Sequence, residues 1–299
     1  MKPYAQVALF FAFTQLLGIF AGIVLINGAA ANPELRELSV APKELIPDAN
    51  SPLNAVVFLV YILAGAVMII LVARFYHGMM FYRLLEFVVV STASSIVFIA
   101  IAYALLGIGL VDAITIGMAL GLLLGAAKFL KPEVKNAAAI ISSSGVGAIF
   151  GFSMGFLPTV LFTILLSIYD YIAVFKTKHM ITMARELSTR QLSFAITAKE
   201  VPERKKGEKT EVYVDRAMKE GERLDLGTGD LSVPAMISVS AYTLGPNGLI
   251  YSLAVALGST LSLYLLLRFV SKERVFLPAL PPICFGGMFA LLLVKLAGF

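Results

Sequence analysis

Tryptophan is absent from this chain of 299 residues, and histidine and cysteine are nearly so. The lone cysteine, Cys284, excludes a disulfide within the chain and any CxxC metal site. The two histidines, His77 and His179, lie far apart, so no metal or other cofactor is expected. Charged residues make up only 14% of the chain, against about 25% in a typical soluble domain. A soluble globular protein is therefore excluded.

Hydrophobic residues are what the chain has in abundance. They make up 59% of it, and the mean hydropathy of +0.88 is that of an integral membrane protein surrounded by lipid. The net charge of +5 then reflects the orientation of the chain in the membrane, and no nucleic acid is expected as a partner.

Nine segments are long and apolar enough to cross a membrane, which takes about 20 residues. They are residues 5–27, 53–73, 84–106, 110–130, 137–155, 158–175, 224–241, 246–268 and 275–297. The first segment could be a signal peptide, but its apolar run exceeds the usual length of about 7–15 residues, so we expect a retained helix. Pro158 favours a break between the fifth and sixth segments, because proline fits the first turn of a helix better than its interior.

The placement of positive charge tests this count. With nine helices and the N-terminus in the cytoplasm, 21 of the 24 lysines and arginines lie on the cytoplasmic side, as the positive-inside rule requires. The predicted fold is an all-α, multi-pass protein of the cell membrane with nine transmembrane helices. Its N-terminus is expected in the cytoplasm and its C-terminus outside.

A long polar stretch, residues 176–223, divides the chain into a six-helix part, 1–175, and a three-helix part, 224–299. Residues 180–198 are compatible with an amphipathic helix on the membrane surface, and the rest of the stretch is expected to be a flexible cytoplasmic linker near anionic lipid. Glycines at four-residue intervals predict close helix packing in the fourth and fifth segments. They are Gly117, Gly121, Gly125, Gly147, Gly151 and Gly155.

Two carboxylates fall inside predicted helices, where ionisable side chains are costly and usually functional. Three other acids lie near helix ends, where headgroups can solvate them: Glu86, Asp112 and Asp225. Asp170 lies six residues before Lys176, and Asp230 lies seven residues after Arg223. At a helical rise of 1.5 Å per residue, both lie about 10 Å from the cytoplasmic surface. The two carboxylates can therefore face each other if their helices are neighbours.

A pair of carboxylates in an apolar site holds a single proton, because both cannot ionise cheaply. The ionised member can take a proton from a water that attacks a carbonyl, while the protonated member donates to the carbonyl oxygen. This chemistry hydrolyses a peptide bond. The same pair could instead relay protons in a transporter.

Two further motifs lie at this depth. Glycines at 227 and 229 directly before Asp230 leave room for an extended substrate backbone. Prolines at 278, 281 and 282 interrupt the start of the last helix. Backbone groups left unpaired there are tolerated only beside protein or a water-filled cavity.

Together these motifs resemble the YD, GxGD and PAL motifs of the presenilin and signal-peptide-peptidase family of intramembrane aspartyl proteases. The resemblance covers the whole chain in helix count, and the compact form is similar to archaeal presenilin homologues. It implies that Asp170 and Asp230 are the catalytic pair. It also implies a set of residues that support the active site and hold substrate: Tyr169, Gly227, Thr228, Gly229, Pro278, Ala279 and Leu280.

The resemblance carries further expectations. A cytoplasmic N-terminus is similar to the presenilin branch and opposite to signal peptide peptidases. Thr228 stands where presenilins usually have leucine, which implies a changed substrate preference. The expected substrates are transmembrane proteins. The sequence demands no accessory subunit, and a homo-oligomer is compatible with it.

Two alternatives stay open from the sequence. A proton-coupled transporter or a cation channel would use the same aspartates, although the inverted repeats of a transporter are not visible. A prepilin-peptidase-like enzyme also uses a GxGD aspartate, but the PAL motif and the nine-helix layout fit it poorly.

Overall fold

The computed structural model describes residues 2–40, 48–75, 79–172, 195–200, 222–273 and 278–298. These residues contain nine α-helices: α1 (Pro3–Ala31), α2 (Leu53–Phe75), α3 (Met79–Leu105), α4 (Leu110–Leu130), α5 (Lys135–Ser153), α6 (Phe156–Ile172), α9 (Thr228–Ala241), α10 (Gly248–Glu273) and α11 (Leu280–Leu296). Three short 3-10 helices, η1 (Pro33–Leu38), η2 (Pro132–Val134) and η4 (Tyr242–Leu244), and two strands, β1 (Ala195–Glu200) and β2 (Glu222–Gly227), complete the described elements.

The helices are those of an integral membrane protein. Five of them, α1, α3, α4, α5 and α10, are long and apolar enough to cross a membrane, and α2, α6 and α11 contribute shorter apolar segments. Large apolar side chains such as Met68, Leu123 and Phe285 are exposed on the outer faces of these helices. A continuous apolar surface of this kind suits contact with lipid better than contact with water.

The break predicted before Pro158 is present. Helix α5 ends at Ser153 and α6 begins at Phe156, so Pro158 lies in the first turn of α6. The main-chain amide of Thr159 donates to the carbonyl of Gly155. Residue 158 precedes this bond and lies in the first turn, where a main-chain amide has no partner within the helix, so proline loses no hydrogen bond there.

The glycine spacing marks helix contacts, as predicted. A Cβ built on Gly117 of α4 would lie 2.9 Å from the Cα of Ile99 in α3, and one on Gly151 of α5 would lie 2.6 Å from the Cβ of Val239 in α9. Gly155 is an exception because it lies between α5 and α6, beside Ala49 and Asn50. Small residues therefore join α3 to α4 and α5 to α9 at close range.

A β-hairpin corrects the all-α expectation. β1 and β2 pair antiparallel, with Thr197 opposite Asp225. Residues 224–227, predicted as helix, and 195–198, predicted as the end of a surface helix, are strand instead; residues 180–194 lie outside the described part of the chain. The reason is a two-residue alternation, in which Ile196, Ala198 and Leu226 enter the core and the residues between them do not.

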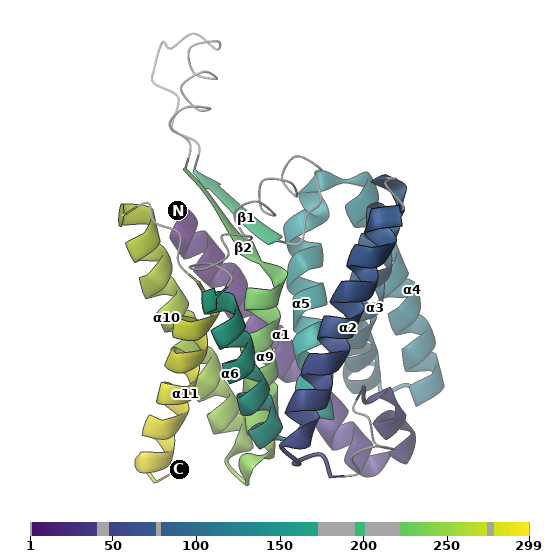
Figure 1. Cartoon of the computed structure of the whole chain (residues 1–299). Helices are drawn as coiled ribbons and strands as arrows, with labels where there is room; N and C mark the ends of the chain where they lie inside the picture. Colours follow the sequence, from purple (N-terminus) through teal and green to yellow (C-terminus); the bar gives the residue numbers. More distant parts are fainter. Residues whose placement is uncertain are drawn as a thin grey trace, which may run out of the picture.

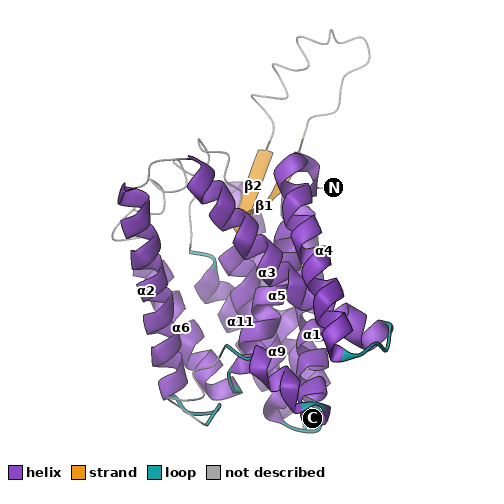
Figure 2. Ribbon diagram, turned by 90° about the vertical axis from the view of Figure 1, so that its right-hand side faces the viewer, coloured by secondary structure: helices purple, strands orange, loops and turns teal. Residues whose placement is uncertain are grey.

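Helix α9 lies at the centre of the bundle and contacts α1, α5, α6, α10 and α11. Each of its residues from Leu231 to Ala241 is buried. The hairpin and the N-terminus lie at one end of the bundle, and the C-terminus lies at the other (Figures 1 and 2). β2 leads directly into α9, so the strand delivers the chain to the middle of the molecule.

Candidate active site

Asp170 lies in the last turn of the described part of α6 and is buried, with 8% of its surface exposed. Its neighbours Tyr169 and Tyr171 are 62% and 54% exposed, because successive residues of a helix point in different directions. The Oδ2 atom of Asp170 is buried and has no hydrogen-bond partner among the described residues. An unpartnered buried carboxylate oxygen is costly and points to a site that awaits a ligand or a proton.

Asp230 lies in the first turn of α9, where the strand becomes helix at Gly227. The carboxylate is close to Gly227, since a Cβ on that glycine would lie 3.5 Å from Oδ2. The main-chain amide of Gly227 interacts with the same carboxylate. The amides at a helix N-terminus and the helix dipole both favour a negative charge in this position.

The two aspartates and the PAL motif come together. The carboxylates of Asp170 and Asp230 are near enough to interact electrostatically, and α6 contacts both α9 and α11. Leu280 is the first residue of α11, so its amide has no partner within the helix. That amide interacts with the carboxylate of Asp170. Three motifs distant in sequence thus form one site.

The backbone that leads to Asp230 differs from the predicted helix. The depth predicted for Asp230 assumes a helical rise from Arg223, but residues 223–227 belong to β2. A strand advances about 3.3 Å per residue, so the arithmetic of equal depth was wrong although the two residues do meet. Pro278 and Ala279 are outside the helix, as predicted, whereas Pro281 and Pro282 form its first turn.

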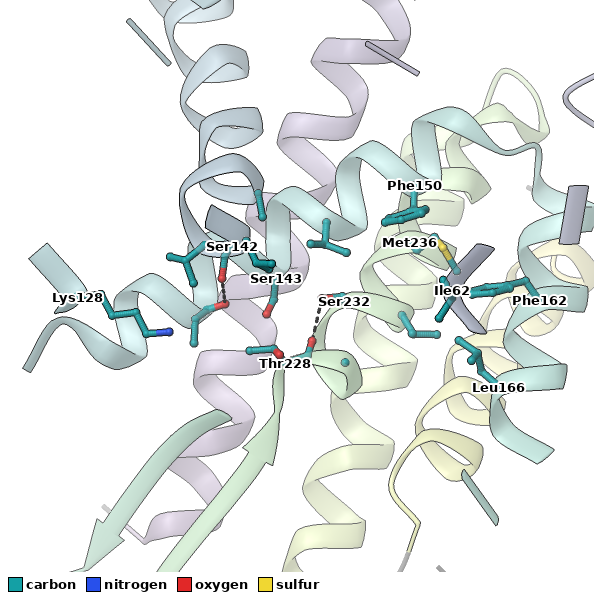
Figure 3. A pocket seen from close by; sticks show the side chains of 17 residues that line it. Ile62, Lys128, Ser142, Ser143, Phe150, Phe162, Leu166, Thr228, Ser232 and Met236 are labelled. Carbon is teal, nitrogen blue, oxygen red and sulfur yellow. Dashed lines mark hydrogen bonds between the residues drawn. The ribbon is translucent and has the colours of Figure 1, made fainter. Parts of the chain in front are cut away.

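A cavity of about 260 Å³ adjoins the glycine motif (Figure 3). Thr228 and Gly229 form part of its wall, and Ser142 and Ser143 of α5 and Ser232 of α9 add hydroxyl groups. The opposite part of the wall is apolar, with Phe150, Phe162 and Met236. The Oγ of Ser143 is buried without a hydrogen-bond partner in the described chain. A polar group of a bound molecule can meet it there.

Several residues of this region were missed by the sequence analysis. The serines of α5 were not singled out, although three consecutive serines at 142–144 in an apolar helix are a visible signal. Glu86 was expected to meet lipid headgroups, but its Oε1 lies 2.7 Å from Nζ of Lys128, which lines the cavity. α3 begins at Met79 instead of residue 84, so Glu86 lies deeper in the helix than expected.

Tyr169 was expected at the site, and Cys284 was not. Tyr169 does not line this cavity, and its side chain is exposed on α6. Cys284 is buried and close to both aspartates. Within the described residues, no group of three or more His, Cys, Asp or Glu side chains is placed to hold a metal ion.

A family model described as signal-peptide peptidase, presenilin aspartyl protease matches residues 15–298. The chain belongs to this family. As a member of the signal-peptide peptidase and presenilin family, it is an aspartic endopeptidase of the membrane, and the alternative of a transporter or channel is not favoured. Comparison with curated proteins gives no match.

Solved structures agree with this family in fold. Two crystal forms of a presenilin family intramembrane aspartate protease are similar to the chain, one in space group C222 and one in P2. The TM-scores are 0.66 and 0.65 at 24% sequence identity. Each match covers 99% of this chain, and 100% and 99% of the solved chains, respectively.

Proposed function

We propose that the protein hydrolyses peptide bonds within the transmembrane segments of other membrane proteins, with Asp170 and Asp230 as the catalytic pair. The observation that supports this proposal most strongly is the meeting of the two carboxylates with the Leu280 amide at one point inside the bundle. No part of this chemistry needs a metal ion or a covalent intermediate.

The two carboxylates act as one unit that holds a single proton. The ionised member accepts a proton from water as the water attacks the carbonyl carbon of the substrate. The protonated member donates to the carbonyl oxygen, and collapse of the tetrahedral intermediate returns a proton to the leaving amine. The Leu280 amide contacts Asp170 and the Gly227 amide contacts Asp230, so each carboxylate is oriented by a main-chain donor.

The substrate is expected to unwind and add to the hairpin as a strand. Each backbone group that a substrate helix frees in lipid costs several kcal/mol if left unpaired. β2 ends at Gly227 and leads to the catalytic Asp230, so its outer edge can supply main-chain partners next to the reaction. Thr228 and Gly229, which line the cavity, then contact substrate side chains, and Pro278 and Ala279 hold the other side. Tyr169 supports the site through its position beside Asp170.

The arrangement in the membrane belongs to the same proposal. The nine helices of the described chain all cross the cell membrane, as six in residues 1–175 and three in residues 224–299, joined by the cytoplasmic residues 176–223. The N-terminus lies in the cytoplasm and the C-terminus outside. The chain acts alone or as a homo-oligomer, without an accessory subunit.

Cleavage of a single-span substrate by the purified full-length protein in detergent tests the proposal. We expect products from the parent and none from Asp170→Asn or Asp230→Asn, because an amide cannot exchange the proton that each step needs. Thermal unfolding of the variants serves as the control for folding. Cleavage that survives either substitution would refute the mechanism.

A further inference from the structure

The outer edge of β1 is closed by a side chain of α5. The Nδ2 of Asn136 donates to the carbonyl of Thr197 at 2.8 Å, and the Thr197 amide donates to Oδ1 of Asn136 at 3.0 Å. A single amide side chain thereby satisfies the donor and the acceptor that an added strand would use. Unpaired strand edges invite pairing with other chains, so this closure prevents the addition of a strand to β1 at Thr197.

The closure also fixes the hydrogen-bonding phase of the hairpin. In an antiparallel pair, opposite residues either exchange both main-chain hydrogen bonds or direct both groups outward. Thr197 directs its groups to Asn136, so Asp225, which lies opposite, directs its own main-chain groups to the outer edge of β2. Gly227, two residues further along, has the same orientation, and its amide interacts with Asp230. The outer edge of β2 is therefore the edge from which the chain continues to Asp230.

A second layer of contacts holds the hairpin against α5. Nζ of Lys135 lies 3.1 Å from Oγ1 of Thr197, which in turn donates to Oδ1 of Asp225. On the opposite face, Ile196 and Leu226 pack in a core that includes Ala139 of α5. β1 contacts α5, and β2 contacts α9. A continuous path of contacts thus runs from α5 through both strands to the first turn of α9.

We propose that Asn136 is a positioning residue that directs substrate to one edge of the hairpin and sets which peptide bond reaches the aspartates. The inference rests on the proposed strand addition to β2. A strand added to the β1 edge would lie two strand spacings, or about 10 Å, from β2, against one spacing, or about 5 Å, for a strand added to β2 itself. Its peptide bonds would then be too far from Asp230 to be cut. A hairpin released from α5 would also present substrate in more than one register.

The test compares three variants of the full-length protein with the parent. Asn136→Ala removes both bonds to Thr197, and Asn136→Asp keeps the acceptor and removes the donor. Thr197→Val is the matched control, because it removes the hydroxyl contacts in the same strand and leaves the main-chain bonds to Asn136 in place. A single-span peptide substrate is digested, and its products are identified by mass spectrometry.

We expect the parent and Thr197→Val to cut at the same positions. For Asn136→Ala, we expect a smaller share of the main product and additional products from cleavage at neighbouring bonds. The ratio of the main product to these additional products should fall by a factor of about five for each hydrogen bond lost. The product distribution of Asn136→Asp should lie between those of the parent and Asn136→Ala. This variant tests the same point if Asn136→Ala does not fold. Unchanged product positions in a folded Asn136 variant, or the same broadening in Thr197→Val, would overturn the proposal.

Hydrogen exchange of residues 195–200 separates this proposal from the proposed function. The Thr197 amide should be protected in the parent and should exchange faster in Asn136→Ala, whether or not the protein cleaves the substrate. A parent without activity but with this protection would refute the proposed function alone. Equal exchange in the parent and the variant would refute the positioning role of Asn136.

Discussion

Gly229, the residue before Asp230, faces empty space. A Cβ at this position would meet no atom of the described chain within 4 Å, and the residue lines the cavity. We expect Gly229→Ala to leave the thermal unfolding temperature unchanged or slightly higher, since alanine favours a helix. The proposed substrate occupies this space, so kcat/KM should fall by about tenfold or more. Wild-type kcat/KM in a folded Gly229→Ala variant would show that the substrate backbone does not approach this residue.

The pH dependence of cleavage also follows from single residues, since the proposed mechanism has Asp170 and Asp230 share one proton. At low pH both carboxylates are protonated, and no base is left to activate water. At high pH both are ionised, and no acid is left to protonate the carbonyl oxygen. We expect kcat/KM to fall on both sides of an optimum. A profile that is flat from about pH 4 to pH 9 would contradict the paired mechanism.

At the scale of helices, the contact of α5 with α9 supports the site through small residues. A Cβ on Gly151 would lie 2.6 Å from the Cβ of Val239 and 2.7 Å from the carbonyl oxygen of Met236. Since backbone cannot move aside easily, Gly151→Ala should destabilise the protein by about 1–3 kcal/mol. Gly65→Ala is the matched control, because a Cβ on that helical glycine meets nothing within 4 Å in the described structure. Equal unfolding temperatures for the two variants would contradict the proposed packing.

The helices of this molecule are well predicted by the sequence because lipid imposes one length and one polarity on each of them. α4 (Leu110–Leu130) matches its predicted bounds, and the break before α6 follows from a single proline, Pro158. The hairpin was missed since the alternating run at 222–227 is short and joins an apolar helix without a break. A window of about 20 residues averages such a strand into the helix that follows.

The candidate site shows the same contrast: residues that stand out within one segment were predicted, and contacts between distant segments were not. Asp170 and Asp230 were predicted because acids are conspicuous within apolar segments. The ion pair of Glu86 with Lys128 was missed because it depends on how α3 and α4 pack. The bonds from Asn136 to Thr197 join residues 61 positions apart across two elements, and neither residue stands out in its own segment.

At the scale of the whole molecule, the ends of the bundle differ in a way that can be measured. The hairpin and the N-terminus share one end, and the C-terminus lies at the other (Figure 1). Ser51 precedes α2 and is expected outside the cell, whereas Lys205 belongs to the predicted cytoplasmic stretch, in residues that the structure does not describe. Single cysteines at these positions, Ser51→Cys and Lys205→Cys, therefore report the orientation.

A membrane-impermeant maleimide added to intact cells should label Ser51→Cys and not Lys205→Cys, and after the cells are opened it should label both. The parent should remain unlabelled under both conditions because its one cysteine, Cys284, is buried. Five helices of the described chain, α2 to α6, lie between Ser51 and Lys205, so the two positions fall on opposite sides of the membrane if each of these helices crosses it. Labelling of both positions from the same side of the membrane would overturn the nine-helix arrangement.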